Sequence, residues 1–132
     1  MPDLEREKTY IDSFISSDKR SRYHELFNST KGREKLLNRL AHSPDFIPQY
    51  MHKIQDNKQN RESILQILKS KGAPDKCYII SESSKLDGKE LDLTEALDLV
   101  VGSTMGTVIL CIPSKLAYYE GEDINERYIL EK

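Results

Sequence analysis

Basic side chains with one tyrosine among them form the first group that could do chemistry. Residues 19–39 hold seven lysines and arginines, opposed only by Glu25 and Glu34. Such a cluster attracts the phosphates of a nucleic acid or the carboxylates of an acidic protein, and Tyr23 could stack on a base. The simpler interpretation is a solvated helix face, because the whole chain carries a net charge of −2 and nucleic-acid modules are usually basic. The candidate anion- or partner-binding residues are Arg20, Arg22, Arg33, Lys35 and Arg39.

Helical geometry adds a condition to this hypothesis. If the cluster binds one partner, Arg20, Arg22, Arg33 and Arg39 should share an exposed face. Successive helical residues are turned by about 100°, so Arg20 and Arg22 point about 200° apart. We therefore expect one of those two to point away, while Arg33 and Arg39 fit within one broad face.

Tyrosines near the C-terminus form a second candidate surface. In the segment "LAYYEGE", Tyr118 and Tyr119 are adjacent, so they point to opposite faces of a strand. We expect one of them in the core and the other exposed beside Glu120. Together with Tyr128, an exposed tyrosine would anchor a protein partner. The alternative is that all three are ordinary strand residues, since tyrosine favours sheets.

Carboxylates form the third group. Those that follow the strand predicted at 77–81 are interleaved with serines and could bind a metal or act as acid and base. Their spacing does not match a calcium loop, and a solvated Asp-Gly turn is the simpler interpretation. Glu82 or Glu120 acting with a histidine remains the enzyme alternative. The acidic residues after the strand are Glu82, Asp87, Glu90 and Asp92, and the histidines are His24, His42 and His52.

No metal or cofactor site is expected from the remaining residues. The three histidines lack a recognised ligand spacing, and neither Cys77 nor Cys111 has a second cysteine nearby in sequence. Both cysteines stand in apolar runs, so we expect buried, unpaired thiols that behave as small hydrophobic side chains.

A glycine-rich stretch, "VVGSTMGTVILC" at 100–111, resembles a phosphate-binding loop only in composition. A phosphate loop leads from a strand into a helix, whereas here a helix ends at Gly102 and a strand starts near Thr107. A membrane span is also disfavoured, because Glu95 and Asp98 lie within residues 93–113. We expect Gly102 to end the helix and Gly106 to admit the backbone into a tight strand.

Periodicity predicts the elements that position these groups. Helices are expected within 4–15, 16–27, 28–44 and 60–72, the last ended by Gly72 at positive φ. Residues 43–58 are expected to form a loop with one helical turn after Pro48. A short helix over 93–102 lies among the predicted strands, which are 77–81, 107–112, 116–120 and 127–130.

This order predicts an α+β fold of one domain, residues 1–132, helical over 1–75 and mostly strand over 76–132. Four N-terminal helices precede a β-α-β-β-β segment. We expect this segment to form a small antiparallel sheet, one face of which is covered by the helices. Charge is divided between the two parts. Residues 1–75 hold 14 basic and 11 acidic residues, whereas residues 76–132 hold 6 and 11.

These observations favour a non-catalytic binding module whose partner is a protein or a second copy of the chain. A nucleic-acid binder using residues 19–39 and an acid–base enzyme are the alternatives. The charged residues 1–10 contain no apolar segment of the kind that starts a secretory signal. We accordingly expect a cytoplasmic protein that does not bind membranes.

Overall fold

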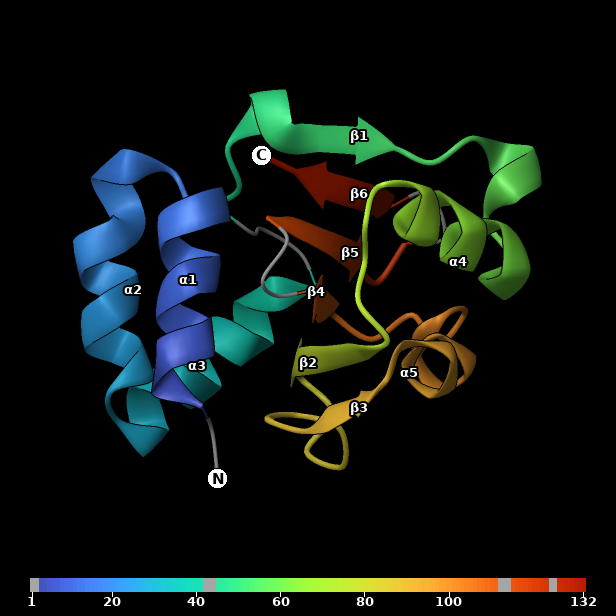
Figure 1. Ribbon diagram of the computed structural model, residues 1–132. Helices are drawn as coiled ribbons and strands as arrows, with labels where there is room; N and C mark the ends of the chain where they lie inside the picture. Colours follow the sequence, from blue (N-terminus) through green and yellow to red (C-terminus); the bar gives the residue numbers. More distant parts are fainter. Residues whose placement is uncertain (1–2, 42–44, 112–114, 124–125) are drawn as a thin grey trace.

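The computed structural model of the 132-residue chain describes residues 3–41, 45–111, 115–123 and 126–132. These residues form an α+β fold, as the sequence predicts, with five α-helices and one six-stranded antiparallel sheet (Figure 1). The strand order is β1-β6-β5-β4-β2-β3. His42, one of the histidines considered above, lies outside the described residues.

The helices agree closely with the predicted ranges. They are α1 (Leu4–Phe14), α2 (Arg20–Phe27), α3 (Thr30–Leu40), α4 (Arg61–Ser70) and α5 (Leu93–Val100). Side-chain oxygens of Asp3, Ser29 and Asn60 accept backbone N–H groups of the first turns of α1, α3 and α4, which stabilises those ends. Gly72 follows α4 with φ of 96°, which confirms the predicted left-handed end.

The sheet contains two strands that periodicity did not predict. Its strands are β1 (Met51–Lys53), β2 (Lys76–Ser81), β3 (Glu90–Asp92), β4 (Thr107–Cys111), β5 (Leu116–Glu120) and β6 (Arg127–Glu131). The unpredicted strands, β1 and β3, have three residues each and form the two edges. Runs of three residues are too short for an alternating pattern to be distinguished from chance. The helical turn expected after Pro48 is present at Pro48–Tyr50.

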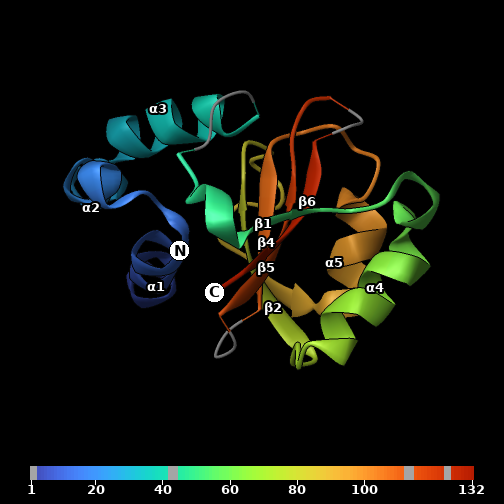
Figure 2. The same cartoon turned by 90° about the horizontal axis from the view of Figure 1, so that it is seen from above.

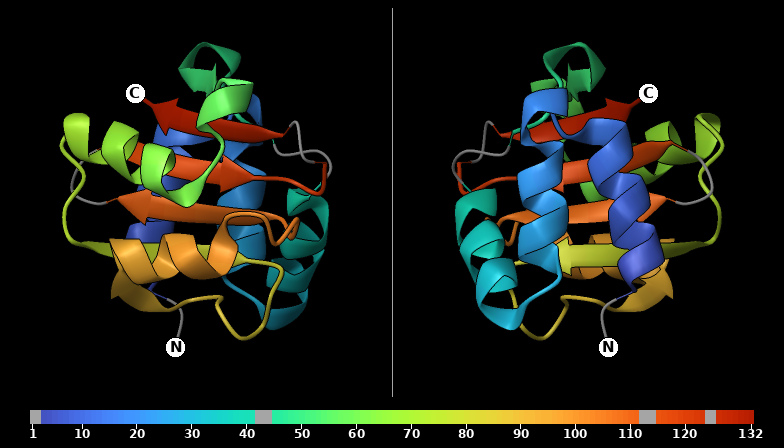
Figure 3. Two further views of the ribbon diagram at one scale, coloured as in Figure 1. Left: turned by 90° about the vertical axis from the view of Figure 1, so that its right-hand side faces the viewer. Right: turned by 90° about the vertical axis from the view of Figure 1, so that its left-hand side faces the viewer.

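Helices cover both faces of the sheet, so the expectation of one covered face is wrong. Figure 2 shows the sheet between α1, α2 and α3 on one side and α4 and α5 on the other. The two panels of Figure 3 show these opposite layers in turn. The short helix predicted between strands therefore joins α4 to close the second face.

Each central strand divides its side chains between two cores. Tyr78, Val108 and Tyr119 pack toward α1–α3, whereas Ile79 and Ile109 pack toward α4 and α5. Alternate residues of a strand point to opposite faces, so two covered faces require apolar residues at every position. This requirement explains why β2, β4 and β5 read as continuous apolar runs.

The expectations for the two cysteines and for Gly102 are confirmed. Cys77 and Cys111 are free and buried, and burial raises the pKa of each thiol to about 12. Gly102 has φ of 88° just after α5. A Cβ at Gly106 would lie 2.5 Å from the backbone nitrogen of Ala41, so only glycine permits this approach of the loop to α3. Within the described residues, each helix is too short or too polar to cross a bilayer.

Candidate functional site

A groove in the α1–α3 layer is the strongest candidate site. It lies between α2 and α3 and has a volume of about 320 Å³. Its apolar floor is Leu26, which is partly buried, and Leu36, which is 5% exposed and belongs to the core beneath, and basic side chains surround them. The residues that line it are Arg22, Leu26, Lys35, Leu36, Asn38 and Arg39.

Local sequence explains why the two helices form this groove. Only Asn28 and Ser29 separate α2 from α3, and the Ser29 hydroxyl accepts the N–H of Gly32 at 3.0 Å. A Cβ at Gly32 would lie 2.3 Å from the carbonyl oxygen of Leu26, so glycine allows the helices to approach closely here. Arg22 and Leu26 are four positions apart on α2, which places them on one face.

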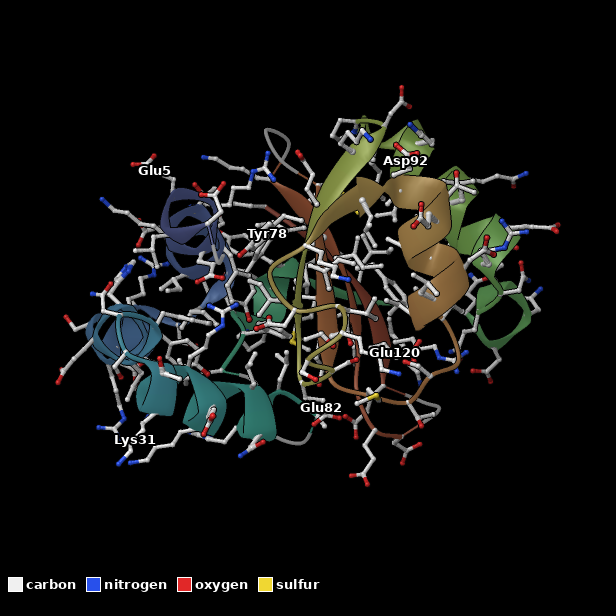
Figure 4. The ribbon with its side chains drawn as sticks, turned by 90° about the horizontal axis from the view of Figure 1, so that it is seen from below. Glu5, Lys31, Tyr78, Glu82, Asp92 and Glu120 are labelled. Atoms are coloured by element: carbon white, nitrogen blue, oxygen red, sulfur yellow. The ribbon has the colours of Figure 1, made fainter. Side chains whose placement is uncertain are left out.

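The lining cations differ in how far they are engaged. Arg22 and Lys35 are exposed. Arg39 is half-exposed and lies 3.6 Å from Asp45. Lys31, in the first turn of α3, projects into solvent (Figure 4). The groove therefore combines an apolar lining with a positive rim.

Arg33 does not join this basic surface, so the expectation that it shares the exposed face with Arg39 is wrong. Its side chain is buried and lies in an ion network that joins α1, α3 and the segment after β2. Nε and Nη2 donate to both oxygens of Asp87 at 2.9 Å, and Nη1 donates to Glu7 at 2.5 Å. Tyr78 also donates to Glu7, at 2.6 Å. Burial alone would lower the pKa of Arg33, but the hydrogen bonds that it donates to these two carboxylates outweigh burial and raise that pKa.

Arg20 is also directed elsewhere. Its Nε donates to the carbonyl oxygen of Ile15 at 2.9 Å, and the residue is half-buried. Arg22 is the exposed member of the pair, which agrees with the expectation that one of the two points away. The surface is thus formed by Arg22, Lys35 and Arg39, and Arg20 and Arg33 have structural contacts instead.

Tyr23 is not placed to stack on a base. The residue is buried, and its hydroxyl donates to Asp45 at 2.7 Å. Burial, with the neighbouring Asp45 carboxylate, raises the pKa of Tyr23 well above its ordinary range. The basic surface consequently has no exposed aromatic ring from Tyr23.

The C-terminal tyrosines form no exposed anchor pair, so the expectation of one exposed tyrosine in β5 is wrong. Tyr118 and Tyr119 are both buried, because helices cover both faces of the sheet. The Tyr118 hydroxyl donates to Glu120 at 2.7 Å, and the Tyr119 hydroxyl donates to the Leu40 carbonyl at 2.5 Å. Tyr128 is partly buried against the same core as Tyr119.

Glu120 has a structural role in the glycine-rich loop. It is fully buried and accepts the backbone N–H groups of Gly102 at 3.0 Å and Thr104 at 2.8 Å (Glu120 is labelled in Figure 4). Arg127 lies 3.5 Å from the same carboxylate. Thr104 has φ of 57°, unusual for a β-branched residue. The N–H groups that a phosphate would need are therefore already bound by the protein's own anion.

Glu82 is not joined to a histidine in any cleft that we describe. Its Oε1 accepts the N–H of Gly106 at 2.9 Å, and the residue lines a cavity of about 280 Å³ beside α3 whose lining contains no histidine. His24 lies 2.9 Å from Asp12, and His52 is on the edge strand β1. The described residues hold no group of three or more His, Cys, Asp or Glu able to bind a metal.

Sequence reasoning identified the cations of the groove but missed its lining. Leu26 and Leu36 belong to the apolar stripes of their helices, and such stripes normally indicate core. A usable signal was present, because Arg22 and Leu26, like Lys35 and Arg39, stand four positions apart and share a helix face. No protein-family model, curated protein or solved structure matches this chain.

Proposed function

We propose that this protein is a binding module that takes an acidic segment of a protein partner, carrying an apolar side chain, into the groove between α2 and α3. One observation carries the proposal. The same groove is lined by two leucines, Leu26 and Leu36, and by three cations, Arg22, Lys35 and Arg39. Apolar side chains supply affinity by leaving water, and the surrounding cations select an acidic partner and speed its association.

The composition of the groove favours a protein over a nucleic acid. Binding of single-stranded nucleic acid relies on aromatic side chains that stack on bases, and Tyr23, the tyrosine within segment 19–39, is buried. The leucines offer no matching contact for a phosphate backbone. A folded acidic peptide, by contrast, matches both parts of the groove, with carboxylates at the rim and a leucine or similar residue inside.

The test is a binding titration with a short fluorescein-labelled helical peptide in which glutamates flank one exposed leucine. Fluorescence anisotropy should show saturable binding that weakens with added salt, since exposed charges are screened. The variant R22E with K35E should weaken binding by about tenfold or more. Both residues are exposed, so the variant is expected to fold normally.

The matched control is K53E with K58E, which makes the same change in net charge at exposed positions outside this groove. It should bind like the wild type. Equal weakening by the control would show that net charge alone governs binding and would overturn the proposal. Wild-type binding of single-stranded RNA or DNA, with none of the peptide, would favour the nucleic-acid alternative instead.

A further inference from the structure

The outer face of α5 has the chemistry that the groove requires. Glu95, Asp98 and Leu99 are all exposed on this helix, and Leu99, at 51%, is one of the most exposed large apolar side chains. Glu95 and Leu99 are four positions apart, which puts them on one side of the helix. Nearby in sequence, Met105 is 38% exposed. An acidic helix with an exposed leucine is thus present in this chain.

We infer that the acidic segment bound by the α2–α3 groove is α5 of a second copy of this chain, an inference that rests on the proposed function. Leu99 would lie against the exposed part of Leu26 at the floor of the groove, and Glu95 would face Arg22 or Lys35. Charge complementarity supports this occupant, because the basic residues of the groove come from the basic part of the chain and α5 from the acidic part.

The architecture requires this contact to be intermolecular. The groove belongs to the layer of α1, α2 and α3, and α5 covers the opposite face of the sheet (Figures 2 and 3). A helix on one face cannot reach a groove beyond the other face of the same molecule. The contact therefore joins two different surfaces. Such a heterologous contact closes into a ring when the rotation between copies allows it, and otherwise leaves one groove and one α5 free at the ends of an open assembly.

The contacts that α5 already makes within the molecule show which of its residues are available to a partner. Asp98 lies 2.7 Å from Arg61 of α4 and is 57% exposed, so part of its charge is already neutralised. Glu95 and Leu99 are therefore the residues whose replacement should weaken the contact most. On the groove side, Arg39 is likewise close to Asp45, which leaves Arg22 and Lys35 as the corresponding pair.

Sedimentation velocity over a range of protein concentrations tests the inference. The wild type should form dimers and larger species as concentration rises, and added salt should reduce them. The groove variant, R22E with K35E, and the α5 variant, E95K with L99A, should each remain monomeric. The control variant, K53E with K58E, should associate like the wild type.

A mixture of the two monomeric variants tests directly whether the groove of one copy binds α5 of another. The groove variant retains an intact α5, and the α5 variant retains an intact groove, so together they should form a complex of one copy each that grows no further. Association of either variant alone, or no complex in the mixture when the wild type associates, would overturn the inference.

The outcomes separate this inference from the proposed function. A wild type that stays monomeric but binds the labelled acidic peptide through Arg22 and Lys35 would overturn the second copy as partner and leave the proposed function in place. A wild type that neither associates nor binds the peptide would remove both.

Discussion

At the scale of single residues, the ion network of Arg33 shows what spacing along the chain cannot reveal. Arg33 is 26 positions from Glu7 and 54 from Asp87, and both carboxylates bond to it. Helix periodicity assigns Arg33 to a face but gives no information about partners so distant in sequence. The three exposed or half-exposed cations of the groove were predictable from charge alone, whereas the buried one was not.

We predict that R33M destabilises the protein by about 3–5 kcal/mol, because it leaves the buried Glu7 and the partly buried Asp87 without their cation. The free energy of unfolding, measured by urea denaturation, checks this value. R22M is the matched control and should change that free energy by less than about 0.5 kcal/mol, since Arg22 is exposed. Similar stabilities for the two variants would contradict a structural role for the Arg33 network.

At the scale of elements, helix boundaries were more predictable than strands. Capping side chains and Gly72 mark helix ends locally, because the groups that end a helix lie within a few residues of it. The edge strands β1 and β3 are paired on one side only, and the identity of β1 depends on a strand that is distant in sequence. That strand is β6, whose residue Leu130 pairs with Met51. The residues near β1 in sequence give no signal of that pairing.

The end of α4 supplies a prediction at this scale. G72A should lower the free energy of unfolding by about 1 kcal/mol, because a Cβ is disfavoured at a φ of 96°. Thermal or urea denaturation measures the change, with Q66A, at an exposed position within α4, as the control. A neutral or stabilising G72A would mean that the chain does not need the left-handed conformation there.

At the scale of the whole molecule, the α+β class was predictable and the second covered face was not. The order of helices and strands indicates the class, but it does not say on which side a helix packs. One signal was available in retrospect. The apolar runs of β2, β4 and β5 do not alternate with polar residues, and continuous runs indicate strands buried on both faces. Burial on both faces is also the reason why both Tyr118 and Tyr119 are inaccessible to a partner.

Burial on both faces predicts destabilisation at alkaline pH. Burial raises the pKa values of five tyrosines above the ordinary value of about 10, and of both cysteines to about 12. Between the ordinary and the raised values the unfolded chain releases protons that the folded chain keeps. Stability is therefore fully present below pH ~8.5 and falls as pH rises, by about 1.4 kcal/mol per pH unit for each such group. The tyrosines are Tyr10, Tyr23, Tyr78, Tyr118 and Tyr119.

Urea denaturation at a series of pH values, together with phenolate absorbance, checks this prediction. The absorbance of the buried tyrosines should appear in one cooperative step that coincides with loss of helical circular dichroism. Gradual ionisation of all tyrosines in a protein that keeps its helices would contradict the two-sided core.

The glycine-rich loop binds an anion that belongs to the protein itself, the carboxylate of Glu120. Because the anion is attached to β5, its effective concentration at the N–H groups of Gly102 and Thr104 is set by the chain and not by the surrounding solution. A free phosphate would have to displace a ligand that never diffuses away. The loop can therefore hold the strained conformation of Thr104 permanently, independent of any metabolite.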